Sequence, residues 1–476
     1  MKKVQLAVVA LLAAPIMAAT VYNYNCTSLP ATSYTYKNIA FPVDVVGNLP
    51  EMDNMPTTDS TTDAGATLGR VLFYDVALSK NNTIACASCH QQQFSFADSA
   101  RFSTGFNGAK GTRNAMGLAH ARFFKEKAFF WDERAATLEA QVLMPIQNPI
   151  EMGLTLDTLV AKISSKAIYP PLFNAAFGST TVTTDKISKA LSQFIRSMNT
   201  YGSRFRQGVN STPGPAATTI FANFTAQENL GKKIFMDTLR GNCQKCHTKN
   251  VMVAGAPRSN GLDSIYADPG LGGVPGFGAG KIGTFKVPSL INIALTAPYM
   301  HDGRYKTLEQ VVNFYSDSIH NTANLSAFLK DATGRARRPH YSDSEKHALI
   351  AFLNTLTDTV ITKDPRWSNP FCPTAARGVK SSTEAEELIP VLSSALYPNP
   401  SKITEPVNFS VIGGQNFEGT IRVFSMAGKL VFQSGCAIEI GNNVVSIPLS
   451  EVSAGMYLLQ LEKEGKILAR ARIVKQ

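Results

Sequence analysis

The sequence predicts a mainly α-helical protein, in which two related helical domains are followed by a small C-terminal β-sandwich. A helical pattern that leads into a CxxCH motif occurs twice, at 61–90 and at 225–247. From about residue 391 the sequence consists of segments rich in β-branched residues, in which apolar and polar residues alternate, joined by glycine-containing turns. A chain of 476 residues is too long for one ordinary core, so several domains are expected.

The composition and the first residues indicate an exported globular protein. The chain is 44% hydrophobic and 17% charged, which is typical of globular proteins. Residues 1–19 contain two lysines, then an apolar run, then small residues, and this is the layout of a signal peptide. No other stretch offers about 20 consecutive apolar residues, so no membrane span is expected.

The charge is moderately basic, with 46 Lys and Arg against 35 Asp and Glu. The one basic cluster, GRARRPH at 334–340, is too short to predict nucleic-acid binding, so no nucleic-acid partner is expected. A basic surface can instead steer acidic partners toward the protein.

The first helical domain is expected over 61–205, after an extended arm at 20–60 that is rich in Thr, Pro, Asn and Tyr. It begins with TTDAGATLGRVLFYD, whose apolar residues approximate one helical face. A later helical pattern at 183–201 also has one apolar side, formed by Ile187, Leu191, Phe194, Ile195 and Met198.

The second helical domain, expected over 206–375, repeats the plan of the first. Thr225 and Glu228 have the spacing of a capping box, and LGKKIF follows where the first copy has LGRVLF. A linker is expected at 376–390, and the β-sandwich over 391–476.

The two CxxCH motifs carry the chemistry. Paired CxxC units could bind zinc, and one CxxC could form a redox disulfide. The histidine after each second cysteine favours covalent haem attachment, in which two thioethers and an axial imidazole come from one short turn. The predicted haem-binding residues are Cys86, Cys89 and His90, and Cys243, Cys246 and His247.

Beyond these motifs, the chain resembles a known family over roughly 61–365. The ordered segments are CxxCH, KGTRNA, FFWDERAATLEAQVLMPIQNPIEMG, CxxCH and FKVPSLINIALTAPYMHDGRYKTLEQVVNFY. Together they resemble the bacterial di-haem cytochrome c peroxidases and the related MauG-type enzymes. The resemblance implies two cytochrome c-like domains, with a peroxidatic haem in the first and an electron-transfer haem in the second.

The resemblance also implies roles for residues between the motifs. Trp131 matches a tryptophan that relays electrons between the haems, although Glu133 stands where the family commonly has Gly. Gln141 and Glu151 match the distal-pocket pair, in which a carboxylate can take a proton from peroxide and return it. Without the resemblance, Trp131 would be read as core packing and Glu151 as an exposed helical residue.

One distal ligand of the family is absent. Peroxidases that need reductive activation have a loop histidine where this chain has Phe106, so the first haem is expected to keep an open site when oxidised. His120 is the nearest other histidine. We expect it to be a packed or capping residue, and distal ligation of the first haem is the alternative.

The sixth ligand of the second haem is expected to be Tyr315, a position at which the peroxidases have Met and the MauG-type enzymes have Tyr. Met300, His301 and His320 are the alternatives. His301 more readily fits a place near the haem edge, where electrons enter.

A calcium ion is implied between the domains, held by Asn114 and by the backbone carbonyls of Thr296 and Pro298. Of the remaining cysteines, Cys26 and Cys372 are expected to form a disulfide, which export permits, and Cys436 to stay a lone thiol.

The C-terminal segment, from YPNPS to IVKQ, resembles the sorting domain of type IX secretion, which implies the secretion machinery as a partner. An unrelated carbohydrate-binding or adhesion sandwich is the alternative.

The function expected is therefore reduction of hydrogen peroxide to water by an exported di-haem peroxidase at the periplasm, at the cell surface or outside the cell. Its electrons would come from a small donor protein, a cytochrome c or a cupredoxin. The alternatives are a MauG-type oxidase acting on a protein or organic substrate, and a non-catalytic di-haem electron carrier.

Overall fold

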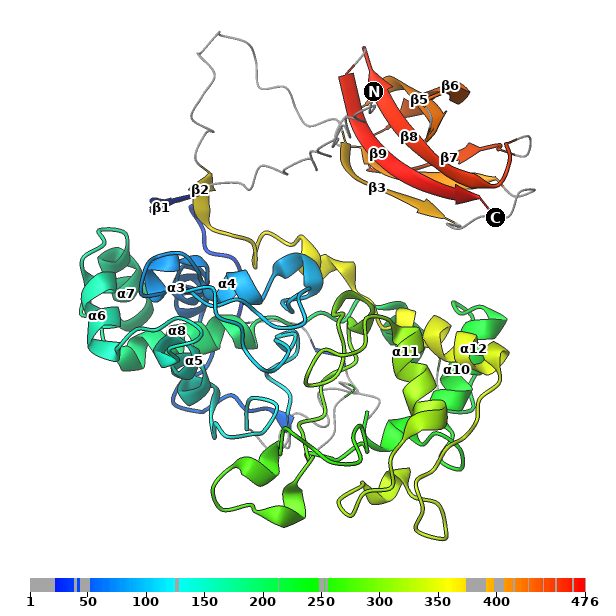
Figure 1. The fold of residues 1–476 in the computed structure, drawn as a ribbon. Coiled ribbons are helices and arrows are strands. Elements are labelled where there is room, and N and C mark those ends of the chain that lie inside the picture. Colours follow the sequence, from blue (N-terminus) through cyan, green and yellow to red (C-terminus); the bar gives the residue numbers. More distant parts are fainter. Residues whose placement is uncertain are drawn as a thin grey trace, which may run out of the picture. The chain divides into compact units, whose positions relative to one another are not determined.

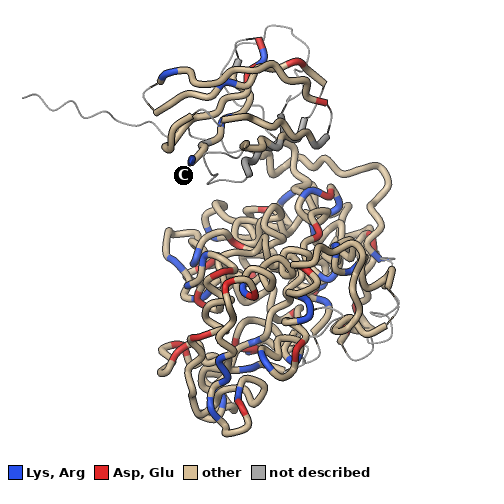
Figure 2. The backbone as a smooth tube through the Cα atoms, turned by 90° about the vertical axis from the view of Figure 1, so that its right-hand side faces the viewer, with Lys and Arg blue, Asp and Glu red and all other residues tan. Residues whose placement is uncertain are grey.

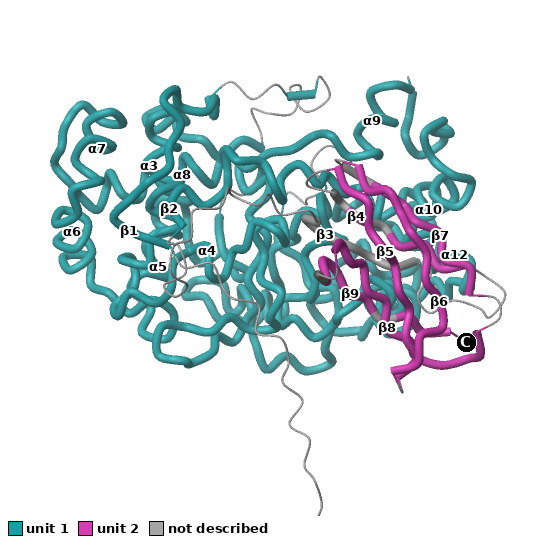
Figure 3. The backbone as a smooth tube through the Cα atoms, turned by 90° about the horizontal axis from the view of Figure 1, so that it is seen from above, with its two compact units in different colours: residues 1–377 teal, residues 378–476 magenta. Residues whose placement is uncertain are grey.

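The computed structural model describes residues 22–37, 41–42, 52–124, 128–212, 214–247, 252, 256–373, 391–397, 406–413, 416–426, 428–439, 441–449, 452–464 and 466–475. The predicted signal peptide and linker lie outside these residues. Helices dominate the part before residue 374 and strands dominate the tail (Figure 1). The chain divides into two compact units, 1–377 and 378–476 (Figure 3).

Helices joined by long irregular segments make up the first unit. The first half contains α3 (Asp63–Tyr74), α4 (Cys86–Cys89), α5 (Leu138–Gln147), α6 (Leu156–Ser164), α7 (Tyr169–Phe177) and α8 (Thr184–Arg196). The second half contains α9 (Arg204–Ser211), α10 (Ala226–Met236), α11 (Leu308–Asn313) and α12 (Asp343–Asn354).

Local sequence sets where most of these helices begin. Apart from α4 and α7, each starts after a Ser or Thr whose side chain accepts the backbone N–H three residues later. The capping box that the sequence predicts at Thr225 and Glu228 is confirmed at the start of α10.

The glycine shared by the LGRVLF and LGKKIF segments has the same role in both halves. A Cβ atom on Gly69 of α3 would lie 1.9 Å from the carbonyl oxygen of Ala190 in α8. A Cβ atom on Gly231 of α10 would lie 1.8 Å from the carbonyl oxygen of Ala348 in α12. Each helix pair can cross this closely because glycine has no side chain, so the predicted repeat is also a repeat in packing.

Each half has its own hydrophobic core. The apolar face predicted at 183–201 is buried in the first core, where each of its five residues is at most 5% exposed. Phe235 of α10 and Phe352 of α12 lie in the second core, with ring centroids 5.0 Å apart.

Residues 359–373 follow the second half in sequence but pack against the first. Ile361, Trp367 and Phe371 belong to the first core. The Tyr74 hydroxyl of α3 donates a hydrogen bond to the Trp367 carbonyl oxygen over 2.7 Å. This strap lies within the range predicted for the second domain, yet it closes the first.

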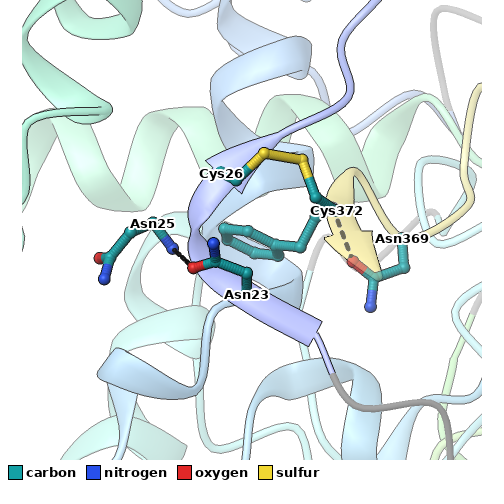
Figure 4. Close-up of a disulfide and its surroundings, with 6 residues drawn as sticks. Asn23, Asn25, Cys26, Asn369 and Cys372 are labelled. Carbon is teal, nitrogen blue, oxygen red and sulfur yellow. Dashed lines mark hydrogen bonds between the residues drawn. A yellow bond between two sulfur atoms is a disulfide. The ribbon is translucent and has the colours of Figure 1, made fainter. Parts of the chain in front are cut away.

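A disulfide fastens the end of the strap to the start of the described chain (Figure 4). Strand β1 (Tyr22–Thr27) pairs antiparallel with β2 (Phe371–Pro373), and Cys26 and Cys372 are bonded across this pair. The expected disulfide is confirmed, and Cys436 is a free cysteine.

The second unit has seven strands in two antiparallel sheets. They are β3 (Val391–Tyr397), β4 (Val407–Gly413), β5 (Phe417–Ser425), β6 (Leu430–Ile438), β7 (Gly441–Ile447), β8 (Gly455–Lys463) and β9 (Lys466–Lys475). The sheet orders are β3-β4-β7 and β6-β5-β8-β9. One core contains side chains of both sheets, such as Phe409 of β4 and Leu459 of β8.

Among the helices of the described residues, none combines the length and the hydropathy needed to span a bilayer.

We predict that Gly231→Ala destabilises the first unit by about 1–3 kcal/mol, because the new methyl group would meet the α12 backbone. Thermal unfolding followed by circular dichroism measures this. Gly280→Ala is the matched control, since a Cβ atom there meets nothing within 4 Å. Equal melting temperatures for the two variants would contradict the role assigned to Gly231.

Candidate functional site

A single cavity of about 1080 Å³ receives side chains from both CxxCH motifs. Pockets for one small molecule hold roughly 300–1,000 Å³, so this cavity exceeds the usual single-ligand site. Its walls include the predicted residues Trp131, Gln141, Glu151 and Tyr315. Positions far apart in the sequence therefore meet at one site.

The first motif forms one closed turn that ends at its histidine. The His90 N–H donates to the Cys86 carbonyl oxygen over 2.9 Å, which closes the short helix α4. The His90 Nδ1 atom lies 3.0 Å from the Phe96 carbonyl oxygen, so Nε2 is left to bind a metal. Burial lowers the pKa of His90 and favours the neutral ring that a metal needs.

The second motif repeats this arrangement. The His247 N–H donates to the Cys243 carbonyl oxygen over 2.9 Å, and His247 Nδ1 lies 3.2 Å from the Met252 carbonyl oxygen. Burial lowers the pKa of His247 to about 4. The four motif cysteines are all free. Within the described residues, no three His, Cys, Asp or Glu side chains gather as a metal cluster.

Two polar side chains lie on the wall beside the first motif. Gln141 comes from α5, and Glu151 lies in the turn after it rather than on an exposed helix. Burial raises the pKa of Glu151, and the Arg134 guanidinium and Asn148 partly offset this effect. The Asn148 Nδ2 atom donates to Glu151 Oε1 over 2.8 Å. Glu151 is thus a held carboxyl group with a raised affinity for a proton.

The loop with Phe106 is fastened to the same turn. The Phe106 N–H donates to the Glu151 carbonyl oxygen over 2.9 Å, and Asn81 Nδ2 donates to the Phe106 carbonyl oxygen over 2.8 Å. The Phe106 ring lies against Gly153, where a Cβ atom would come within 2.4 Å of it. Ser103 and Gly105 line the cavity, whereas the Phe106 ring packs on the turn.

Trp131 is held by both halves of the unit. Its indole N–H donates to the Asn114 carbonyl oxygen over 2.8 Å, and its own carbonyl accepts the Lys286 N–H over 2.7 Å. The Asn114 N–H in turn donates to the His301 carbonyl oxygen over 2.8 Å. Trp131 therefore lies at the junction of the halves, on the wall of the shared cavity.

Tyr315 and Met300 are both within hydrogen-bonding reach of one amide group. Asn260 Nδ2 is 3.2 Å from the Tyr315 hydroxyl and 3.7 Å from the Met300 sulfur. Tyr315 is in a π-helical segment, Phe314–Ser318, a distortion that is frequent at functional sites. Burial raises the pKa of its hydroxyl.

The histidines expected elsewhere differ in position. His120 is buried and packed against Tyr201, with ring centroids 5.1 Å apart, as expected for a packed residue. His301 is stacked on Phe285 at 3.8 Å and lines the cavity. His320 is exposed and does not line this cavity.

The expected calcium ligands Asn114, Thr296 and Pro298 all border the cavity. The side-chain amide of Asn114 donates to the carbonyl oxygens of Ala100 and Arg101 over 3.1 and 3.3 Å.

Comparison with known proteins identifies the family. A family model described as "Di-haem cytochrome c peroxidase" matches residues 63–212 and 225–359, more than half of the chain. The chain belongs to the di-haem cytochrome c peroxidase family. A second model, described as "Secretion system C-terminal sorting domain", matches residues 395–476.

Relatives of this peroxidase family member carry two kinds of name. The cytochrome c551 peroxidase of Nitrosomonas europaea is 33% identical over 284 residues, covering 56% of this chain and 80% of that protein. The methylamine utilization protein MauG of Methylorubrum extorquens is 29% identical over 320 residues, covering 64% of this chain and 82% of that protein. A crystal structure of "a MauG-like protein associated with microbial copper homeostasis" is 30% identical, with a TM-score of 0.60, covering 70% of this chain and 99% of that one.

Membership of the di-haem cytochrome c peroxidase family implies haem c and makes the chain an oxidoreductase of the cytochrome c peroxidase type. A non-catalytic electron carrier is therefore set aside. The sorting domain shows that the enzyme is exported.

Three residues of the peroxidase site escape prediction from sequence. Arg134 stacks on Phe130, with its guanidinium carbon 3.7 Å from the ring centroid, beside Glu151. Lys286 places its ammonium group 3.4 Å from the Phe124 ring centroid, and Asn260 joins Tyr315 to Met300. The sequence feature that could have indicated Arg134 is its position as a cation inside the aromatic FFWDERA segment. No sequence feature indicates Asn260.

We predict that Cys243→Ala combined with Cys246→Ala removes one of two covalently bound haems. The thioether bonds of the second site need these thiols, whereas the first motif stays intact. A pyridine haemochrome assay should give one haem per chain instead of two. Cys436→Ala is the control and should keep both haems, because this cysteine is in the second unit. Retention of both haems by the double variant would contradict the assignment.

Proposed function

We propose that the enzyme reduces hydrogen peroxide to water with electrons from a small donor protein, a cytochrome c or a cupredoxin. One observation supports this most directly: the cavity that receives both CxxCH motifs also receives Glu151, Gln141 and Trp131. Residues 61–205 would form the peroxidatic haem domain, and residues 206–375 the electron-transfer haem domain.

Cys86, Cys89 and His90 would hold the first haem c, and Cys243, Cys246 and His247 the second. When bound, the first supplies the iron that peroxide binds and the second supplies electrons. The raised pKa of Glu151 suits a group that takes a proton from one peroxide oxygen and delivers it to the other. Asn148 holds this carboxylate in place, and Gln141 offers an amide from α5 on the same wall.

Trp131 would carry electrons between the two sites. Its indole nitrogen and its carbonyl oxygen are hydrogen-bonded to different halves, so its ring stays fixed at the junction. Ion pairs also join the two halves next to Trp131. Arg113 pairs with Asp132 of the first half over 2.6 Å and with Asp268 of the second half over 2.7 Å.

Calcium would bind between Asn114 and the carbonyl groups of Thr296 and Pro298. Oxygen donors of this kind suit Ca²⁺, and all three residues border the cavity. Because the Asn114 carbonyl also accepts the Trp131 indole N–H, the ion would help to position the tryptophan.

The tail from 391 to 476 would be a β-sandwich that serves as an export address of the type IX kind. Two antiparallel sheets with a common core and the sorting-domain match support this. The signal peptide at 1–19 and the linker at 376–390 complete the export scheme, with the secretion machinery as the partner.

The second candidate is a MauG-type oxidase that acts on a protein or an organic substrate. The position of Tyr315 favours it, because a phenolate ligand lowers a haem potential relative to a thioether ligand. The Tyr315 hydroxyl faces the Asn260 amide on the cavity wall, and Met300 is the alternative ligand next to it.

We predict that Glu151→Gln lowers peroxide turnover by about 10²–10⁴-fold, because the amide cannot exchange a proton. The assay is peroxide-dependent oxidation of a reduced cytochrome c. Activity of the unmodified enzyme should fall as the pH drops through the raised pKa of Glu151, because the protonated form cannot act as a base.

Glu309→Gln is the control for Glu151→Gln, because Glu309 is an exposed residue of α11. Full activity in Glu151→Gln would refute the role of this carboxylate. Peroxide consumption that oxidises an organic substrate but no donor protein would favour the oxidase.

We predict that the oxidised enzyme reacts with peroxide without prior reduction. The loop that carries Phe106 has no histidine and is fastened to the Glu151 turn, so it offers no distal ligand. Electron paramagnetic resonance should show one high-spin and one low-spin ferric signal, with equal peroxide rates before and after pre-reduction. Two low-spin signals, or a rate that appears only after reduction, would refute this.

A further inference from the structure

The basic segment GRARRPH, 334–340, has no part in the proposed reaction, yet it borders the second CxxCH site. Arg337 Nη1 lies 3.0 Å from the Thr238 carbonyl oxygen and 2.8 Å from that of Leu239. Its Nη2 atom donates to the Lys330 carbonyl oxygen over 3.1 Å. Arg337 thus joins the basic segment to the turn that precedes Cys243.

These joined segments lie beside the second CxxCH motif. Arg240, Leu329 and Arg337 line the same cavity as Cys243 and Cys246. Asn242 Nδ2 adds a bond of 3.2 Å to the Phe328 carbonyl oxygen across the same junction. We call residues 237–245 together with 328–338 the basic rim.

The basic rim has one strongly exposed apolar side chain among its cations. Leu239 is 86% exposed, which is unusual for a leucine in a turn held by so many hydrogen bonds. Lys245, Arg335 and Arg338 are exposed on the same two segments. Lys and Arg occur along many segments of the chain (Figure 2), and in the rim two of them, Arg240 and Arg337, also line the cavity.

Nearby acidic groups are already engaged. The Glu345 carboxylate pairs with Arg240 and accepts the Ser342 N–H. The Asp331 carboxylate accepts the backbone N–H groups of Thr333 and Arg335. Six Lys and Arg residues of the basic rim stand against two Asp residues, so its net charge is positive.

We propose that the basic rim docks the electron-donor protein, and that this donor is a small redox protein with acidic groups around an apolar patch at its redox centre. The inference rests on the proposed function and specifies its partner. Opposite charges would steer the encounter, and Leu239 would give the dry central contact. Docking here would place the donor beside the segments that line the second haem site.

The test uses the full-length protein with both haems and two reduced probes of opposite charge. The acidic probe is the soluble domain of cytochrome b5, and the basic probe is mitochondrial cytochrome c. Stopped-flow absorbance gives the second-order rate of probe oxidation at about 10 mM and about 150 mM ionic strength, where the Debye length falls from about 30 Å to about 8 Å.

The variants reverse charge at exposed positions outside the proposed haem-binding residues. Arg335→Glu combined with Lys245→Glu changes the basic rim, and Leu239→Ser removes its exposed apolar side chain. Lys363→Glu combined with Lys37→Glu is the charge-matched control, because both lysines are exposed and lie outside the rim. The Lys37 N–H donates to Asp63 of α3, and Lys363 is on the strap packed against the first half.

The acidic probe should react faster than the basic one at low salt, and its rate should fall about tenfold or more at high salt. The rim charge reversal should lower this rate about tenfold at low salt, with the control pair within about twofold of the unmodified protein. Leu239→Ser should weaken the reaction at both salt concentrations.

Equal rates for the two probes, or equal losses in the rim and control variants, would overturn the docking proposal. Peroxide turnover with the uncharged reductant guaiacol separates this result from a failure of the proposed function. If guaiacol turnover persists in every variant and the rim variants leave the oxidation rate of the acidic probe unchanged, only the docking proposal fails. If the unmodified protein consumes no peroxide with either probe or with guaiacol, the proposed function itself fails.

Discussion

The site depends on one interaction made twice: a backbone carbonyl occupies Nδ1 of each motif histidine. Phe96 supplies it to His90 and Met252 supplies it to His247. With Nδ1 occupied, each ring presents Nε2 alone to the cavity, and burial keeps the ring neutral. The closed turn of each CxxCH fixes the thiols beside the ring, so one local geometry defines both ends of the cavity.

Helix packing keeps the two CxxCH motifs at fixed positions relative to each other. Gly69 and Gly231 let each leading helix lie directly on a partner helix, which anchors the motif that follows. Polar bonds then lock the halves together, as in the buried Asn292 amide that donates to Ser95 Oγ over 3.1 Å. Trp131 is hydrogen-bonded within this joint, so its distance to each motif is set by the fold and not by a mobile side chain.

The sequence was most informative where chemistry is local. The capping box at Thr225 depends on a few neighbouring residues, and the structure confirms it. The CxxCH motifs and the lack of a loop histidine near Phe106 are equally local features of the sequence. It was least informative where distant backbone takes part. Nothing in the sequence shows that Arg337 binds the carbonyls of a turn about a hundred residues away. Nor does it show that the Asn260 amide contacts both Tyr315 and Met300.

The Cys26–Cys372 disulfide lies just before the predicted linker to the sorting tail, and it closes a covalent ring across a sequence separation of 346 residues. A pull on the tail would therefore reach the first unit by two covalent routes, the backbone before Cys372 and the disulfide to Cys26. Severing the linker outside this ring would free the tail and leave the closed catalytic body as it was.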